Sequence, residues 1–436
     1  MTDSPLLRNA KVRTSIVVLL LTVLFDRLFW HQGLGLNLTL FAMAAMCGSL
    51  VVMRRTISFS AQLTLVGMLV CAVMVVVHGS TVAKVGTMLA LAVSALLLFE
   101  PTVRSLPLAL IGSLVNLVHT PIGVAGVLSE GLKQVPVTRS GWRWVRLAFV
   151  PVLVTLLFFL IYRSANPRFE ALASDFFGDF FDVFWDLMAE LFTPHMFFLG
   201  FGLLVSGALV HRFAPQLFAG PSWPLNESLV RQRKKRAHWL APLSMGALER
   251  ERRTGLILLS LVNALLLIVN LVDISWVWIG FEVEEGFNLK QFVHEGTYLL
   301  ILSILLSIGI LLHLFRGNLN FHPKERSMRM LATAWIAQNF ILGLSVFLRN
   351  YHYIHFHGLA YKRIGVVVFL VLVLVGLVTL YLKIRERRTL NYLLRVNGWA
   401  AFAMMVGLTT VNWDGLIVRF NLAHWNQGEI DVDNYL

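Results

Sequence analysis

The chain has 436 residues, of which 57% are hydrophobic and only 14% are charged, and its mean hydropathy is +0.72. Because soluble domains carry about 25% charged residues, this composition excludes an ordinary soluble protein and predicts an all-α, multi-span bundle of transmembrane helices. The formal net charge of +13 does not indicate a nucleic-acid partner, because the basic residues form short clusters between apolar segments, as cytoplasmic loops do.

The first apolar segment, Ser15–Trp30, follows three basic residues and so begins like a signal peptide. No small-residue cleavage site follows it, and we therefore interpret it as a retained first helix. Asp26 and Arg27 are neighbours in its outer third, and we expect them to neutralise each other there.

The charge rule for membrane loops predicts about eleven spans with a cytoplasmic N-terminus and a periplasmic C-terminus in a bacterial inner membrane. Their approximate bounds are 15–30, 36–53, 61–78, 81–99, 145–162, 196–210, 255–279, 294–315, 330–348, 364–384 and 393–411. This count treats Leu106–Leu128 as re-entrant or interfacial, because two prolines, an asparagine and a histidine lie within it between basic flanks. Lys362 and Arg363 are an exception to the charge rule, since they fall on the predicted outer side.

Three segments outside the spans belong to what we interpret as one integral membrane domain, residues 1–436. Residues 167–193 predict an amphipathic helix in the outer interface, because four aspartates recur on one face between large aromatic residues. These aspartates are Asp175, Asp179, Asp182 and Asp186. Residues 212–254 form a basic cytoplasmic loop that anionic lipid would attract, and residues 412–436 form an extracytoplasmic tail. We expect membrane lipids as partners, with the aspartate helix or the tail as the surface for other membrane or periplasmic proteins.

Ionisable and aromatic residues gather at the outer ends of several predicted spans. A charge near hydrocarbon costs about 2.5 kcal/mol or more, so such residues generally face a bundle interior or a watery cavity. The predicted binding site consists of Asp273, His294, Glu295, Arg349, Tyr353 and His355. Arg349 keeps its charge and must either reach the headgroups or pair with a carboxylate, and we expect Glu295 or Asp273 as its partner.

Two kinds of chemistry were considered for this cluster. Zinc can bind the ring nitrogens of histidines such as His352, His355 and His357. Their H-x-x-H-x-H spacing is not a tight metal-binding motif, however, and such residues are equally common in an aromatic belt at the membrane interface. No metal is therefore predicted. Proton relay through the histidines and Asp273 is the other alternative. The sequence contains no Walker loop, HExxH, GxSxG or Rossmann glycine pattern, and we predict no cofactor and no catalytic residue.

Polar residues also occur in the middle of predicted spans. Asn263 and Asn270 lie within the span at 255–279, and Gln338 and Asn339 lie within the span at 330–348. Amides in lipid generally hydrogen-bond to neighbouring helices, and we expect Gln338 and Asn339 to do so.

Several stretches carry a family resemblance: DRLFWHQGLGLNLTLF at 26–41, LIVNLVDISWVWIGF at 267–281, FVHEGTYLLILSILLSI at 292–308, FRGNLNF at 315–321, WIAQNFIL at 335–342, RNYHYIHFHGLAYKRIGV at 349–366 and VNWDGLIVRFNL at 411–422. Together they resemble a family of bacterial multi-pass membrane proteins known only as a domain of unknown function, with members typical of the Bacteroides–Flavobacterium lineage. The resemblance implies an inner-membrane helical protein with an outward C-terminal region, and it implies no activity.

Three classes of function remain open. Polar groups within the spans favour a transporter or channel-like protein. The amphipathic helix, the tail and the lack of a catalytic motif favour a non-enzymatic sensor, assembly or scaffold subunit. A membrane enzyme acting on a lipid-linked substrate would use His294 or Glu295 as its base and Arg349 to hold a phosphate. A cavity lined by Asp273, His294 and Arg349 would favour the first or third class, and a solid bundle the second.

Overall fold

The computed structural model describes residues 10–53, 56–132, 193–213, 226–231, 244–279 and 289–423, together with positions 151, 155, 159 and 168. None of these residues lies in a β-strand, apart from an isolated bridge between Ser228 and Arg388. The same part of the chain contains eight helices that are long and apolar enough to cross a membrane, or nine if one bent pair counts as a span. The protein is therefore an all-α, multi-span membrane protein, as the composition predicts.

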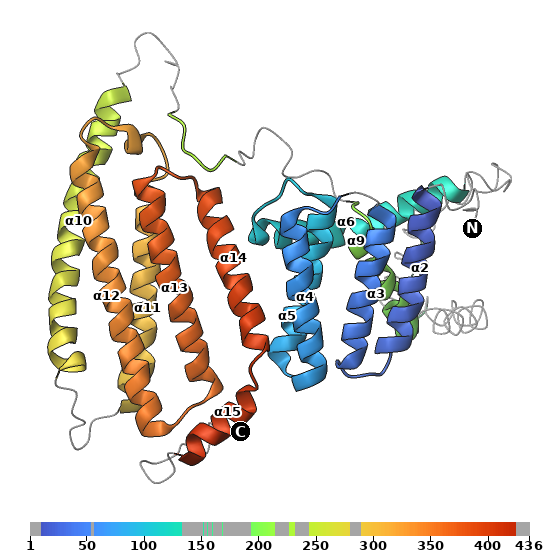
Figure 1. The fold of residues 1–436 in the computed structure, drawn as a ribbon. Coiled ribbons are helices and arrows are strands. Elements are labelled where there is room, and N and C mark those ends of the chain that lie inside the picture. Colours follow the sequence, from blue (N-terminus) through green and yellow to red (C-terminus); the bar gives the residue numbers. More distant parts are fainter. Residues whose placement is uncertain are drawn as a thin grey trace. The chain divides into compact units, whose positions relative to one another are not determined.

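The α-helices, in chain order, have the following bounds (Figure 1): α2 Ala10–Phe29, α3 Leu36–Met53, α4 Phe59–His78, α5 Thr81–Phe99, α6 Leu106–Leu132, α9 Pro194–Val210, α10 Ser244–Asp273, α11 Leu289–Leu314, α12 Glu325–His357, α13 Tyr361–Arg385, α14 Leu390–Thr409 and α15 Trp413–Ala423. A π-helix, Ile274–Trp278, follows α10, and a 3₁₀-helix, Asn318–Phe321, precedes α12.

The chain forms two compact units, whereas the sequence interpretation treats it as one domain. Unit 1 comprises residues 1–65, 87–101 and 110–217, and unit 2 comprises residues 66–86, 102–109 and 218–436. The predicted span at 145–162 and the aspartate helix at 167–193 fall almost wholly outside the described residues. Most of the predicted basic loop lies outside them as well.

The N-terminal helices agree closely with the predicted spans. α3 and α5 have the predicted ends, and α4 begins two residues earlier than predicted, at Phe59. The turn from α4 to α5 is tight because Gly79 adopts a φ of 61°, which a residue without Cβ reaches without strain. Apolar composition therefore predicts these helices well, since a segment in lipid must satisfy its own backbone hydrogen bonds.

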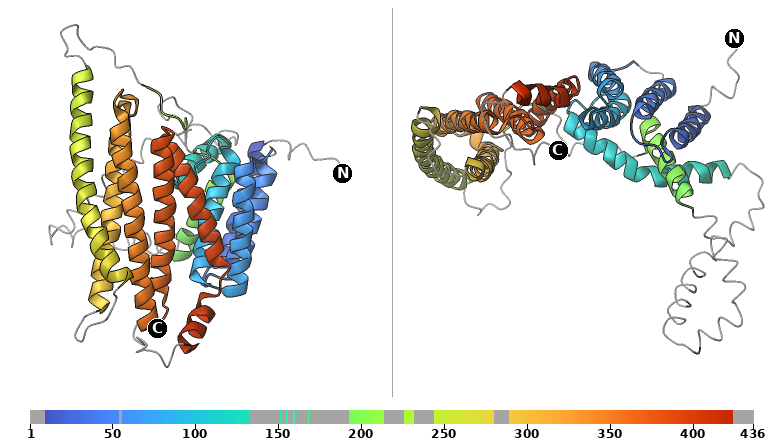
Figure 2. Two further views of the ribbon diagram at one scale, coloured as in Figure 1. Left: turned by 60° about the vertical axis from the view of Figure 1, so that its left-hand side comes forward. Right: turned by 90° about the horizontal axis from the view of Figure 1, so that it is seen from below.

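Of the two alternatives predicted for Leu106–Leu128, the re-entrant one is wrong, because α6 is one continuous helix of 27 residues with Pro121 inside it, and the interfacial one stays a prediction. A re-entrant segment needs a break in the helix, and the neighbouring helices of a bundle make a proline tolerable without one. Its length and hydropathy would suffice for a span. Seen from below, α6 lies lengthwise while α2 and α3 are viewed nearly along their axes, so α6 lies across them (Figure 2).

Two predicted boundaries in unit 2 differ from those of the structure. The basic loop predicted to reach residue 254 ends before Ser244, where α10 begins, because Glu249 bonds to Arg252 and Arg253 within a helical turn. The span predicted to end at residue 348 continues to His357, since residues 349–357 contain no glycine or proline. The tail predicted from residue 412 begins with a helix, α15, at 69° to α14.

Unit 1 is held together by close contacts between α2, α3 and α9. A Cβ added to Gly202 of α9 would lie 2.6 Å from the ring of Phe25, and one added to Gly48 of α3 would lie 2.7 Å from Val17. Small residues at such points let membrane helices approach each other closely.

Asp26 does not pair with Arg27 as expected. Its Oδ1 lies 2.6 Å from Nε2 of His195 at the start of α9. Adjacent residues of a helix point in different directions, so Asp26 meets a side chain of the neighbouring helix instead.

Unit 2 has α12 at its centre, in contact with α10, α11 and α13 (Figure 2, left). Its hydrophobic core includes fully buried side chains from all four helices, among them Leu259, Ile304, Leu342 and Leu380. This arrangement places α10 and α12 side by side along much of their length, so polar residues on their facing sides lie close together.

Candidate functional site

A column of polar residues, here called the polar seam, joins α10 to α12. Asn263 Nδ2 donates to the carbonyl of Leu331 at 3.1 Å, and Asn270 Nδ2 donates to the carbonyl of Gln338 at 3.1 Å. Gln338 Nε2 in turn donates to Asn263 Oδ1 at 3.0 Å. The donor Asn270 lies seven residues after the donor Asn263, and the acceptor Gln338 lies seven residues after the acceptor Leu331. The two helices are therefore parallel, and they pack with the seven-residue repeat of a coiled coil.

The expectation that mid-span amides bond between helices is confirmed for Gln338 and wrong for Asn339. Asn339 Nδ2 donates at 2.8 Å to the carbonyl of Trp335, one turn earlier in its own helix. The difference arises because consecutive residues lie on different faces of α12, and only Gln338 faces α10.

The polar seam ends at an ion pair between Arg349 of α12 and Asp273, the last residue of α10. Arg349 Nη2 lies 2.5 Å from Asp273 Oδ1, and the two residues are only 7% and 5% exposed. The prediction that Arg349 pairs with a carboxylate is therefore confirmed for Asp273. Removing one partner of a buried ion pair generally costs about 3–5 kcal/mol.

The depth of this pair follows from the length of α12. Its 33 residues extend about 50 Å, whereas the hydrocarbon layer of a bilayer is about 30 Å thick. From Arg349 to the end of α12 at His357 the helix rises about 12 Å. If α12 is centred on the bilayer, the pair lies just inside the boundary of the hydrocarbon.

Asp273 uses only one of its two carboxylate oxygens in this contact. Its Oδ2 is buried and accepts no hydrogen bond from any residue that the structure describes. Asn270 Oδ1, about one turn earlier on α10, is also buried and accepts no hydrogen bond from any described residue. A buried acceptor without a donor costs about 1–3 kcal/mol, so this position favours a further hydrogen-bond donor.

The π-helix Ile274–Trp278 begins directly after Asp273. Such segments are rare and occur frequently at functional sites. Here Val277 is buried, and Trp278 Nε1 donates at 2.9 Å to the hydroxyl of Ser345 on α12. The sequence analysis missed this feature, because ISWVW contains neither glycine nor proline and reads as ordinary apolar helix.

Tyr353 and His355, two other predicted site residues, lie further along α12. Tyr353 is buried, but its ring packs against Arg363, whose Cζ lies 4.4 Å from the ring centroid. His355 is exposed on α12. His294 and Glu295 belong to the first turns of α11, and their side chains lie outside the described residues.

Arg363 also explains the exception to the charge rule. It is buried at the start of α13 and donates from Nη1 to the carbonyl of His357 at 2.7 Å and to that of Gly358. These carbonyls end α12, where the helix dipole and the unpaired acceptors attract a cation. Arg363 is thus held in place by a helix terminus, whichever side of the membrane it faces.

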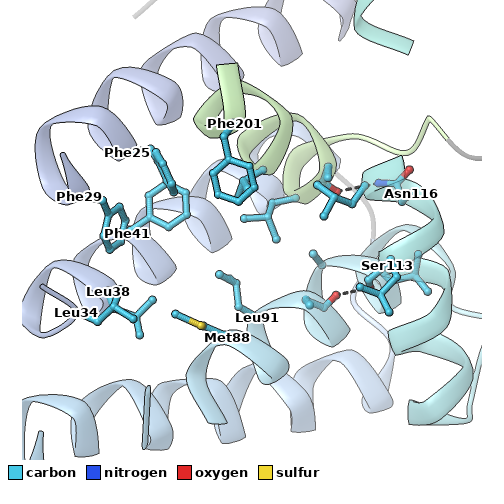
Figure 3. Close-up of a pocket in the computed structure, with 18 of the residues that line it drawn as sticks. Phe25, Phe29, Leu34, Leu38, Phe41, Met88, Leu91, Ser113, Asn116 and Phe201 are labelled. Atoms are coloured by element: carbon cyan, nitrogen blue, oxygen red, sulfur yellow. Dashed lines mark hydrogen bonds between the residues drawn. The ribbon is translucent and has the colours of Figure 1, made fainter. Parts of the chain in front are cut away.

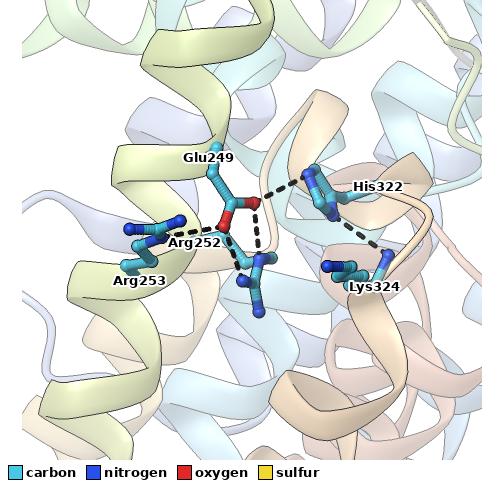
Figure 4. Close-up of polar contacts among 5 residues, drawn as sticks. All are labelled: Glu249, Arg252, Arg253, His322 and Lys324. Atoms are coloured by element: carbon cyan, nitrogen blue, oxygen red, sulfur yellow. Dashed lines mark hydrogen bonds and ion pairs between the residues drawn. The ribbon is translucent and has the colours of Figure 1, made fainter.

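The opposite end of α10 carries a second polar network, centred on Glu249 (Figure 4). Its carboxylate accepts from Arg252 at 2.7 Å and from Arg253 at 2.9 Å, and His322 Nε2 lies 3.2 Å away. His322 Nδ1 accepts the backbone N–H of Lys324 at 3.1 Å, so Nε2 is the nitrogen that carries the proton donated to Glu249. This network ties α10 to the connection between α11 and α12.

No group of three or more His, Cys, Asp or Glu side chains within the described part of the chain is placed to hold a metal ion.

Comparison with known families covers nearly the whole chain. A family model described as Domain of unknown function (DUF4153) matches residues 28–436. The chain belongs to this family. No curated protein and no solved structure matches it. The matched range includes the polar seam and the Asp273–Arg349 pair, but the DUF4153 description supplies no activity, and function must be argued from the geometry.

Proposed function

We propose that this protein is a transporter in which Asp273 alternates between pairing with Arg349 and binding a proton. The observation that carries the proposal is the buried carboxylate with one oxygen in an ion pair and the other without a donor among the described residues. Ionisable groups inside a membrane bundle are costly, and they mark proton relays and substrate pathways.

A proton on Asp273 Oδ2 would cancel the charge that holds Arg349 in place. The guanidinium keeps its own charge at every physiological pH, and the loss of a buried counter-charge weakens its hold at that position. Arg349 would then move to water or to another acceptor, and α12 would shift against α10. Protonation thereby selects between two arrangements of the same pair of helices.

The path of the proton follows α12 toward its C-terminal end. The half-buried His352 lies one turn beyond Arg349, and the exposed His355 follows about one turn later. Imidazole nitrogens can both donate and accept protons, so these two side chains supply steps between water and the carboxylate. The π-helix beside Asp273 supports the proposal further, since local changes in helix geometry are associated with such segments.

One observation favours a scaffold role instead. The polar seam holds α10 and α12 in a single register, as interhelical hydrogen bonds do in membrane bundles. In that role the ion pair would be a fixed link, and protonation would have no part in function.

The two roles are separated by the accessibility of Ser345, which is fully buried beside Trp278 between the two helices. All rates are measured in a variant with Cys47 and Cys71 replaced. The matched control is Tyr351→Cys, exposed on the same helix, whose rate at each pH corrects for the smaller thiolate fraction at acidic pH. Relative to this control, we expect Ser345→Cys to react slowly with a water-soluble thiol reagent at neutral pH and faster at acidic pH. Asp273→Asn, which resembles the protonated state, should make the relative rate high at both values.

A second measurement tests transport itself. Proteoliposomes that contain the full chain and a pH-sensitive dye are given an inside-negative potential, and proton uptake is recorded. We expect uptake that Asp273→Asn abolishes and that Asp414→Asn, at an exposed carboxylate of α15, leaves unchanged. Constant reactivity of Ser345→Cys together with no uptake would establish the scaffold role and refute the proposal.

A further inference from the structure

Helices α2, α3, α5, α6 and α9 of unit 1 surround a cavity of about 470 Å³ (Figure 3). Aromatic and aliphatic side chains make up nearly all of its lining, with Phe25, Phe29 and Phe41 on one side and Leu91 and Met88 on another. Only four lining residues are polar: Gln32, Ser113, Asn116 and Arg212.

Three of the polar lining residues are engaged within the protein. Ser113 Oγ donates to the carbonyl of Ala92 at 2.7 Å, and Arg212 pairs with Glu100. Asn116 Nδ2 donates to the carbonyls of Ala208 and His211 at 2.9 Å, while its Oδ1 accepts the backbone N–H of Phe213. The cavity therefore favours an occupant that is apolar along its length.

The cavity is long in the direction of the helices. It extends from Met88 to Phe99 along α5, which corresponds to about 16 Å of helix. Half of the hydrocarbon layer of a bilayer is about 15 Å thick. One extended chain from one leaflet of the membrane matches this length.

The cavity also has an apolar rim. Leu34, Met88, Leu114 and Phe201 belong to its lining and are exposed, whereas Phe25, Phe41 and Ala95 are buried inside. In a helical membrane protein an exposed apolar rim faces lipid, so a chain can enter sideways from the bilayer without crossing water.

Neither water nor empty space suits this cavity. Water needs two to four polar partners, which an apolar lining does not supply. An empty space of this size would deprive the lining of the close contacts that stabilise protein interiors. We propose that the cavity binds one hydrocarbon chain of a membrane lipid, either a phospholipid acyl chain or a polyprenyl chain. This site lies in unit 1 and is independent of the function proposed for Asp273 and Arg349.

The test uses lipids that carry a photoreactive diazirine near the end of the hydrocarbon chain. The full-length protein is reconstituted in vesicles with either a diazirine phospholipid or a diazirine polyprenyl phosphate and irradiated, and the cross-linked residues are mapped by mass spectrometry. We expect cross-links at buried lining residues such as Phe25, Phe41 and Leu91. Labelling by the phospholipid identifies an acyl chain as the occupant, and labelling only by the other probe identifies a polyprenyl chain.

A pair of variants sharpens the comparison. Ala95→Trp fills the cavity and should remove the cross-links at the buried lining residues. Leu89→Trp lies on the same helix, is 38% exposed and does not line the cavity, so it should leave them unchanged. The map of cross-links in the wild-type protein tests the proposal even if Ala95→Trp does not fold. If both probes label only exposed positions such as Val118, the proposal is overturned.

Discussion

Arg349 and Asp273 are 76 residues apart in the sequence, yet Nη2 of one lies 2.5 Å from Oδ1 of the other across two parallel helices. Arg349→Met should lower the free energy of unfolding by about 3–5 kcal/mol, because it leaves a buried carboxylate without its counter-charge. The measurement is thermal unfolding of the purified protein in detergent.

Adding Asp273→Asn to Arg349→Met should restore part of the lost stability, since the remaining group is then neutral. Arg316→Met, at an exposed arginine, is the control and should change little. If Arg349→Met is as harmless as Arg316→Met, the buried pair does not exist.

The polar seam predicts a measurable coupling between Asn263 and Gln338. In a double-mutant cycle with Asn263→Ala and Gln338→Ala, the interaction free energy should be on the order of 0.6 kcal/mol, as for other hydrogen bonds between membrane helices. Gln338→Ala keeps the backbone carbonyl that accepts from Asn270, so the cycle isolates the side-chain contact. A coupling of zero would contradict the parallel register of α10 and α12.

Gly358, between α12 and α13, should not tolerate a side chain. It has φ 80° and ψ −175°, a region that glycine alone occupies readily, and an added Cβ would lie 2.7 Å from Asn421 Oδ1. We expect Gly358→Ala to cost about 1–3 kcal/mol in thermal unfolding experiments.

The matched control is Gly407→Ala in α14, where nothing lies within 4 Å of the added carbon. Alanine in a helix is favoured over glycine by up to about 1 kcal/mol, so this variant should be neutral or stabilised. Equal effects of the two substitutions would mean that the turn at Gly358 has another conformation.

The orientation in the membrane stays a prediction from the positive-inside rule. In a variant with Cys47 and Cys71 replaced, Ser228→Cys should resist an impermeant thiol reagent in intact cells, whereas Leu422→Cys in α15 should react. Both positions are exposed in the structure. Protection of Leu422→Cys or reaction of Ser228→Cys would contradict a cytoplasmic basic loop and an outward C-terminus.

The sequence alone determined the class of the protein and many of its helix ends. Long apolar runs predict helices because lipid offers the backbone no hydrogen-bond partners, and the bounds of α3 and α5 follow from that rule. The permanent charge of Arg349 likewise required a nearby carboxylate or an exit to the headgroups.

Only the tertiary structure showed that Asp273 reaches Arg349. The register of the seam between α10 and α12 brings these two residues together, and the side chain of Glu295, the other expected partner, lies outside the described residues. The contact between Asp26 and His195 likewise depends on how α2 meets α9. Side-chain packing decides which helices become neighbours, and this choice produces no periodic pattern in the sequence.

The π-helix after Asp273 and the cavity of unit 1 were also decided by tertiary structure. The residues of the π-helix read as ordinary apolar helix, and the residues that line the cavity come from five helices whose hydropathy resembles that of a closely packed core. Whether such side chains meet or leave a space between them depends on helix positions in three dimensions, and hydropathy does not encode those positions.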